Sequence, residues 1–332
     1  MYRKFIGINR NVRWLAGVFL VSAVLYVLNL RHVVSDYYIQ LINLSCINVM
    51  MTVSLNLVNG YTGQFSIGHA GFMAIGAYVS AFITSVLTDS AGFPVFGQYA
   101  VFLAAIAAGI LVAGIAGFLI GLPCLRLNGD YLAIVTLGFG EVIRAVIRLI
   151  PAVGGARGMT GIPKYSNLWI ILIATLAVVV LVRNLVNSAH GRACIAVREN
   201  EIAAGSVGVN AFRTKMMAFV VAAMMAGMAG ALYSHLLCYS QPDLFSMLKS
   251  CDYLVFLYAG GAASISGSIV SAFVLTFLPE VIRFLSDWRM AIYAALLVLI
   301  MLFRPNGLCG GKEIPILRCK NYRLKTRQRQ EG

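Results

Sequence analysis

The sequence predicts an all-α membrane protein, a bundle of about ten spanning helices joined by short loops. Hydrophobic residues make up 60% of the 332 residues and give a mean hydropathy of +0.84. Charged residues make up only 11%, well below the roughly 25% of a soluble domain. Because each span needs about 20 apolar residues, ten spans and their loops use nearly the whole chain and leave no room for a large soluble domain.

Basic residues at the two ends of the chain set the expected orientation. The net charge is +14, with four basic residues before Trp14 and eight from Arg304 onward. Basic flanks of apolar runs are typical of the cytoplasmic side of a membrane and argue against nucleic-acid binding. We therefore expect a cytoplasmic segment at 1–12, a transmembrane domain at 13–305 and a basic cytoplasmic tail at 306–332, close to anionic lipid.

Apolar runs place the spans along the chain. We expect them at 13–30, at 37–58, in a run ending near Leu87, at 99–121, in a run around residue 140, and at 168–186, 216–238 and 288–303. A cytoplasmic tail requires an even number of crossings. For this reason 251–284 is expected to hold two short or re-entrant passes, broken at Gly260–Gly261.

Small residues recur at every fourth position in two of these runs. They form one stripe on each helix, which predicts close packing between helices rather than a ligand site. The residues are Ala105, Gly109, Ala113, Gly117 and Gly121 in the first run and Ala222, Ala226 and Gly230 in the second.

The longest charged interruption of the apolar chain is the segment 190–215. Asn200 is a good helix N-cap and Gly208 a good helix stop, which predicts a short helix at 201–207. Asn210 is positioned to cap the next helix. A short polar helix between two spans suits docking of a partner, and the alternative is a solvated loop that only joins the spans.

A second interruption, from Asn59 to Gly76, contains five glycines and predicts a broken helix at membrane depth. Irregular backbone is tolerated there only inside protein or along a cavity, where transporters place substrates. The alternative is an inner loop followed by a glycine-rich packing helix. A lone histidine in this setting is more often packed and hydrogen-bonded than a proton relay. The candidate pathway residues are Asn56, Gly60, Gly63, Gln64, Ser66, Gly68, His69 and Gly71.

Two charges, Glu141 and Arg144, lie one helical turn apart near the middle of an apolar run. Charges at that depth are costly and are usually paired or functional. We expect a buried pair that either braces helices or lines the pathway. Gly138 and Gly140 suggest a helix break beside them.

The sequence offers no site for chemistry. The seven cysteines are scattered without a CxxC motif, and none of the four histidines has a partner at metal spacing. The phosphate-binding motif GxxxxGK[ST] is missing. The chain is therefore predicted to bind no metal or cofactor and not to be an enzyme or an ATPase.

Five motifs between about residues 40 and 308 resemble the branched-chain amino acid permeases of ABC importers. They are SLNLVNGYTGQFSIGHAGFMAIGAY, RLNGDYLAIVTLGFGEVIRAVI, the glycine-rich 151–163, the Glu201–Gly208 segment and RPNGL at the end. The Glu201–Gly208 segment resembles the family's coupling helix, with one inserted residue, Ile202. In GGAASISGS, Ala263 stands where the family has a third glycine.

This resemblance implies a multi-pass subunit of the bacterial inner membrane with both termini in the cytoplasm. Its implied partners are a second related permease, two cytoplasmic ATPases that bind ATP and Mg²⁺, and a periplasmic amino-acid-binding protein. The implied ATPase-coupling residues are Arg198, Glu199, Glu201, Ala203, Ala204 and Gly208. Two alternatives remain: an ABC permease for urea, amides or another small solute, and an ion-coupled transporter or channel, which would have no ATPase to dock.

Overall fold

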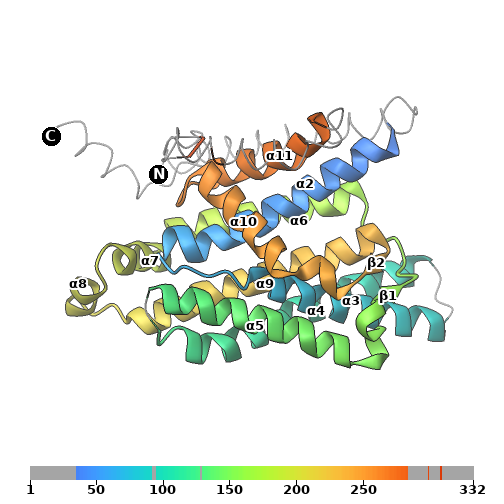
Figure 1. The fold of residues 1–332 in the computed structure, drawn as a ribbon, viewed down its shortest axis with the longest axis horizontal. Helices are drawn as coiled ribbons and strands as arrows, with labels where there is room; N and C mark the ends of the chain where they lie inside the picture. The colour runs from blue at the N-terminus through green and yellow to red at the C-terminus, as the bar shows by residue number, and fades with distance from the viewer. Residues whose placement is uncertain (1–34, 92–94, 128, 283–297, 299–306, 309–332) are drawn as a thin grey trace, which may run out of the picture.

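The computed structural model is mostly helical (Figure 1) and describes residues 35–91, 95–127, 129–282, 298 and 307–308. Several predictions concern other parts of the chain. The segment 1–12, the spans at 13–30 and 288–303, and the tail from residue 309 lie outside the described residues.

Within the described part of the chain, five helical stretches are long and apolar enough to cross a membrane: Asp36–Tyr61, His69–Leu87, Gly97–Cys124, Leu168–Asn187 and Ala211–Leu237. They belong to α2 (Asp36–Leu55) with the π-helical turn η1 (Asn56–Tyr61), α3 (His69–Ala91), α4 (Val95–Cys124), α6 (Leu168–Asn187) and α9 (Ala211–Leu237). These helices agree within a few residues with five of the six apolar spans predicted between 37 and 238, and the sixth, the run around residue 140, is not among them.

Three further helices complete the described part of the bundle. α5 (Asp130–Leu149) carries Glu141, Arg144 and Arg148 and is not among the five apolar stretches. α10 (Met247–Gly260) and α11 (Ile265–Val281) are separated at Gly261, whose φ is +105°. The break predicted at Gly260–Gly261 is therefore confirmed, while the passage of these helices through a membrane stays a prediction.

Short elements close the two ends of the bundle. At one end lie α7 (Ala189–Glu199) and α8 (Glu201–Ser206), and α8 projects at the left of Figure 1. At the other end β1 (Met159–Thr160) pairs antiparallel with β2 (Tyr239–Ser240). Three 3₁₀ turns flank this ribbon: η2 (Pro151–Val153), η3 (Gly155–Arg157) and η4 (Pro242–Phe245).

The helices α3, α4 and α9 pack against one another through their small residues. A Cβ added to Gly76 would stand 2.0 Å from the carbonyl oxygen of Gly227, and one on Gly230 would stand 1.9 Å from that of Met73. A Cβ on Gly117 would stand 2.6 Å from the Cβ of Ala223. The predicted stripes are thus confirmed as surfaces of close backbone approach.

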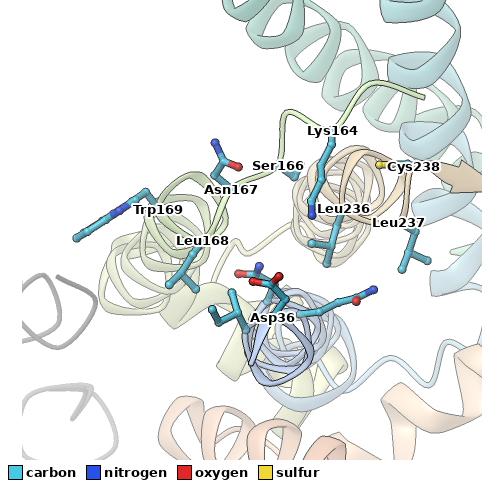
Figure 2. A pocket seen from close by; sticks show the side chains of 12 residues that line it. Asp36, Lys164, Ser166, Asn167, Leu168, Trp169, Leu236, Leu237 and Cys238 are labelled. Atoms are coloured by element: carbon cyan, nitrogen blue, oxygen red, sulfur yellow. The ribbon is translucent and has the colours of Figure 1, made fainter. Parts of the chain in front are cut away.

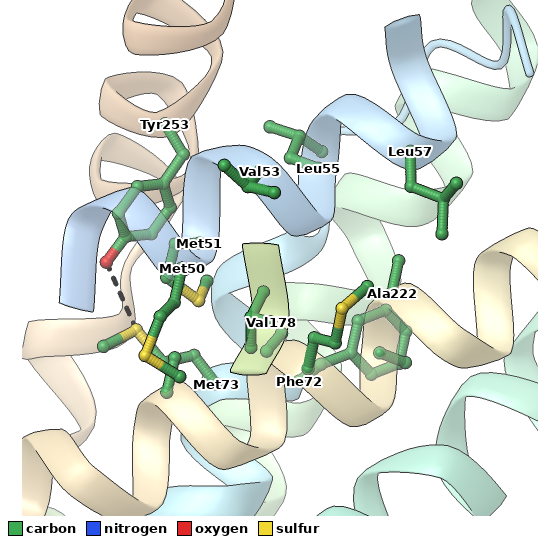
Figure 3. Close-up of a cluster of buried hydrophobic side chains, with 14 of the residues drawn as sticks. Met50, Met51, Val53, Leu55, Leu57, Phe72, Met73, Val178, Ala222 and Tyr253 are labelled. Atoms are coloured by element: carbon green, nitrogen blue, oxygen red, sulfur yellow. Dashed lines mark hydrogen bonds between the residues drawn. The ribbon is translucent and has the colours of Figure 1, made fainter. Parts of the chain in front are cut away.

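Larger apolar side chains fill the space between α2, α3, α9 and α10 (Figure 3). Met50, Met51 and Tyr253 are fully buried there, and the hydroxyl of Tyr253 donates a hydrogen bond to Sδ of Met73 at 3.2 Å. Buried Tyr usually satisfies its hydroxyl in this way. The core therefore binds α10 firmly to α3, although α10 is short.

The outer surface of α4 and α5 is apolar and exposed. Its large exposed side chains are Leu103, Leu111, Ile115 and Leu119 on α4, and Ile134 and Val142 on α5. Soluble proteins rarely expose continuous apolar surface of this kind. This belt suits contact with lipid or with another membrane subunit.

Two glycine substitutions provide a test of the packing. Gly76→Ala places a methyl group against the backbone of Gly227, and overpacking of this kind costs about 1–3 kcal/mol. Gly138→Ala meets nothing within 4 Å and gains up to about 1 kcal/mol of helix propensity. We expect Gly76→Ala to lower the melting temperature in detergent and Gly138→Ala to leave it unchanged or raised. Equal stability of the two variants would contradict the close approach of α3 and α9.

Candidate functional site

The backbone leaves α-helical geometry between α2 and α3, as predicted from the glycines. The π-helical turn η1 covers Asn56–Tyr61, and residues 62–68 have no regular secondary structure. Most of this segment is buried. The interruption is shorter than expected, because the helix resumes at His69, and Gly71 and Gly76 lie within regular α3.

Asn56 joins this interruption to the break between α10 and α11. Its Nδ2 donates to the carbonyl oxygen of Ser264 and to Oγ of Ser268, both at 2.9 Å. Its Oδ1 accepts from the backbone N–H of Ala263 at 2.8 Å. A Cβ on Gly60 would stand 2.5 Å from the Ala263 nitrogen. Two irregular segments about 200 residues apart in sequence therefore satisfy each other's polar groups.

Ala263 adopts the left-handed conformation, with φ +62°. An L-residue pays roughly 1–2 kcal/mol for this conformation, which glycine adopts freely. The side chain is nevertheless buried. The alanine at the family's third glycine position thus keeps the tight backbone turn, at the cost of local strain.

His69 is a packed side chain at the start of α3. Its Nε2 lies 2.7 Å from Oγ of Ser54, and its ring stands edge-on to Phe72. The Ser54 hydroxyl donates to the carbonyl of Met51, so the ring nitrogen is assigned as the donor to Ser54. This geometry fits a fixed structural contact better than a proton relay.

The buried residues Gln64 and Ser66 differ in how they are held. Ser66 is fixed by Asn59, whose amide bonds both the carbonyl and the N–H of Ser66, at 3.2 and 3.3 Å. The side-chain amide of Gln64 has no hydrogen-bond partner among the described residues. Gln64 lines a cavity of about 120 Å³ together with Asp130 and Lys215.

Glycines 68 and 140 bring the broken segment against α5. A Cβ on Gly68 would stand 2.2 Å from the carbonyl oxygen of Thr136, and one on Gly140 would stand 3.5 Å from Cα of Gly68. Thr136 Oγ1 accepts from the N–H of Ile67 at 3.1 Å. The predicted helix break at Gly138–Gly140 is wrong, because α5 is continuous there; the close approach depends on Gly68, and Gly140 lies beside it.

Glu141 and Arg144 form the expected pair, with Oε2 and Nη2 2.6 Å apart. The side chain of Glu141 is 33% exposed and that of Arg144 is 22% exposed. The prediction of a deeply buried pair is therefore wrong. The other Glu141 oxygen accepts from the N–H of Met247 at 3.1 Å, and Arg144 lies 3.9 Å from Asp243. Arg148 also contacts Asp243. These charges fasten α5 to the segment that enters α10, and sequence reasoning missed Asp243 and Arg148.

The short helix predicted at 201–207 is observed as α8, ending at Ser206. The Asn200 side chain accepts from the N–H of Ala203 at 3.0 Å, and Gly208 has φ +86°. Asn210 caps α9 by accepting from the N–H of Arg213 at 2.9 Å. Both predicted caps and the predicted stop are confirmed.

Two features of the segment 190–215 were not predicted. α7 precedes α8, with Ser188 as its N-cap, and α9 begins at Ala211 rather than near Met216. α7 is held to the bundle by buried Cys194 and Val197. Burial raises the pKa of the Cys194 thiol, so this cysteine packs as a small apolar residue.

The predicted coupling residues divide into outward and inward groups. On α8 Ile202 is 87% exposed and nearby Val207 77%, whereas Ala204 is buried. Ala203, Glu199 and Gly208 are exposed, and Glu201 pairs with Lys215 at 2.6 Å. Arg198 points inward.

Arg198 contacts the broken segment directly. Its Nη1 donates to the carbonyl oxygen of Gly60 at 2.8 Å, and its Nη2 pairs with Glu199 at 2.7 Å. A Cβ on Gly63, whose φ is +74°, would stand 2.6 Å from Cγ of Arg198. Candidates from the two predicted sites, the coupling segment and the pathway segment, therefore meet at this side chain.

Residues 37–303 match the family model described as "Branched-chain amino acid transport system / permease component". The chain belongs to this family. The permease is 32% identical to the high-affinity branched-chain amino acid transport system permease protein LivM of Escherichia coli K12, over 94% of this chain and 79% of that protein.

More distant relatives are also named high-affinity branched-chain amino acid transport system permease proteins. It is 25% identical to BraD of Pseudomonas aeruginosa over 80% of this chain and 92% of BraD. It is 22% identical to LivH of Salmonella typhimurium over 80% of this chain and 92% of LivH. No solved structure matches the permease.

The charged pair of α5 allows a double-mutant test. Because the pair is partly exposed, we expect Glu141→Gln and Arg144→Leu each to lower the free energy of unfolding in detergent by about 1 kcal/mol. The double variant should lose less than the sum of the two. Arg126→Leu removes an exposed charge that forms no ion pair with a described residue, and it serves as the control.

Transport by the folded double variant separates the two roles. Uptake at the level of the unaltered permease would show that the pair only braces α5. A folded double variant without uptake would place the pair in the pathway or its gate. Strictly additive single effects would contradict the coupling between the two side chains.

Proposed function

We propose that this chain is a permease subunit of an ATP-driven importer for branched-chain amino acids. The observation that carries the proposal is the coupling segment, in which α8 is capped at Asn200, closed at Gly208 and exposes Ile202 beside the bundle. An exposed apolar side chain on a rigid helix suits docking into a groove of a partner. An ion-coupled transporter would leave this feature without a partner.

The partners follow from this assignment. Two cytoplasmic ATPases bind ATP and Mg²⁺ and receive α8. A second related permease completes the pathway, for which the apolar belt on α4 and α5 offers a surface. A periplasmic amino-acid-binding protein docks at the opposite end of the bundle, near the turns at 151–163. Both termini lie in the cytoplasm, and the full subunit has about ten spans in the inner membrane.

Arg198 provides a mechanical link for coupling. A displacement of α7 and α8 pulls on the Gly60 carbonyl through the guanidinium group. Gly60 lies in η1, and Asn56 in the same turn holds the break between α10 and α11. Movement of the docked helix is thereby transmitted to both irregular segments. The unpartnered amide of Gln64 in the adjoining cavity supports a pathway beside this segment.

Gly208→Val is the first test of coupling. A β-branched residue at φ +86° strains the turn that ends α8, because glycine alone adopts this region at little cost. We expect leucine uptake and ATPase co-purification to fall at least about tenfold, since 1.4 kcal/mol of strain suffices for that factor. Membrane insertion should persist.

Gly205→Val is the matched control for this substitution. Gly205 lies within α8, and a Cβ there also meets nothing within 4 Å. We expect its variant to keep most of the ATPase on co-purification. If both valine variants retained transport and ATPase, the assignment of α8 as the coupling helix would be wrong.

Arg198→Met separates docking from transmission. The substitution keeps much of the aliphatic packing but removes the charged hydrogen bond to Gly60, a contribution of about 1.5–3 kcal/mol. We expect the ATPase to remain bound while leucine uptake per ATP hydrolysed falls by about tenfold or more. Uptake coupled as in the unaltered permease would refute transmission through this contact.

A further inference from the structure

Resting on the proposed function, a second site can be assigned at the end of the bundle opposite α8. We propose that the cavity between the start of α2, the entry to α6 and the end of α9 is a receiving site for a zwitterionic amino acid. Its volume is about 540 Å³, within the range of about 300–1,000 Å³ typical of small-molecule sites. Under the expected orientation it faces the periplasm, where an amino acid arrives.

Two buried polar side chains in the cavity wall lack partners. Asn43 is 4% exposed and Ser166 is 1% exposed. Asn43 Oδ1 and Ser166 Oγ form no hydrogen bond with the described residues. Buried polar atoms are nearly always satisfied in folded proteins, by protein, water or ligand. Both residues belong to the cavity lining, which suits them to bind a polar group that enters the cavity once the side chains turn toward it.

The cavity lining also contains one acidic and one basic side chain, those of Asp36 and Lys164. Asp36 lies two helical turns from Asn43 on α2, and Lys164 lies two residues before Ser166 (Figure 2). Both charged side chains line the cavity, and neither forms an ion pair with a described residue. Figure 2 shows Lys164 extending toward the cavity from the side opposite Asp36.

The chemistry of the two walls matches an α-amino acid. The α2 wall presents the Asp36 carboxylate and the acceptor oxygen of Asn43, which suit an ammonium group. The other wall presents the Lys164 ammonium and the hydroxyl of Ser166, which suit a carboxylate. Leu236 and its apolar neighbours in the lining accommodate a branched side chain. A lone ion would leave one of the two walls unmatched.

A phosphatidylethanolamine headgroup also carries an ammonium group beside an anion, so it could bind the same two walls. The experiment must therefore distinguish this lipid from a free amino acid.

The assembled transporter, containing the full chain, the second permease and both ATPases, is placed in nanodiscs of phosphatidylcholine and phosphatidylglycerol, which contain no phosphatidylethanolamine. Cys238 lines the same cavity. Its alkylation by a maleimide is followed by peptide mass spectrometry, with and without leucine.

We expect leucine to protect Cys238, and isoamylamine or 4-methylvalerate, which each lack one charge, not to protect it. Lys164→Met and Asn43→Leu should raise the leucine concentration needed for protection at least about tenfold. Arg126→Met removes an exposed charge outside the cavity lining and outside every segment assigned to a partner. This control should behave as the unaltered chain.

Three outcomes would overturn the inference. They are a lack of protection in a transporter that imports leucine, equal protection by the singly charged compounds, and protection that appears only when phosphatidylethanolamine is added. The first outcome leaves the proposed function intact. Failure of the transporter to import any branched-chain amino acid would instead refute the proposed function, whatever the state of Cys238.

Discussion

The three hydrogen bonds of Asn56 join the two helix breaks of the described bundle, the one after α2 and the one between α10 and α11. In a membrane, a backbone group without a partner is expensive, so helix breaks survive only where protein satisfies them. Asn56 does this for the N–H of Ala263 and the carbonyl of Ser264, from within a π-helical turn of its own. The strained φ of Ala263 and the absence of a side chain at Gly60 both follow from this close approach.

Close helix packing supplies the rigid frame around these breaks. The carbonyls of Met73 and Gly227 lie where any side chain on Gly230 or Gly76 would stand. α3, α4 and α9 are therefore closely packed, and the described backbone breaks lie outside this unit, beside α2 and between α10 and α11. Arg198 reaches one of these breaks from α7. A rigid unit beside two hinge-like breaks is the arrangement that domain rearrangements in transporters require.

Local signals in the sequence predicted local structure well. The caps at Asn200 and Asn210 and the stop at Gly208 depend on the residue's own backbone, and all three are observed. Contacts between residues far apart in the sequence were harder to predict. The sequence suggests a helix break at Gly140, but α5 is continuous there and packs against Gly68, more than 70 residues earlier. The depth of the Glu141 pair depended on Asp243 and Met247, about 100 residues later, which no spacing in the sequence reveals.

Arg198 shows why the contact between the charged segment 190–215 and the broken segment could not be predicted from the sequence. As one of several charges in a polar segment it was expected to face the ATPase, but its guanidinium is drawn inward because the Gly60 carbonyl needs a donor. The hydrogen bonding at this end of the bundle can be compared with that of the cavity at the other end. Around Arg198 and Asn56 the backbone groups of Gly60, Ala263 and Ser264 have side-chain partners. Oδ1 of Asn43 and Oγ of Ser166 at the other end have none among the described residues, and the same holds for the side-chain amide of Gln64. In natural proteins, buried polar groups without hydrogen-bond partners occur chiefly at functional sites. The hydrogen bonds of Arg198 and Asn56 therefore suit the transmission of movement between segments, and the cavity lined by Asn43 and Ser166 suits a polar solute.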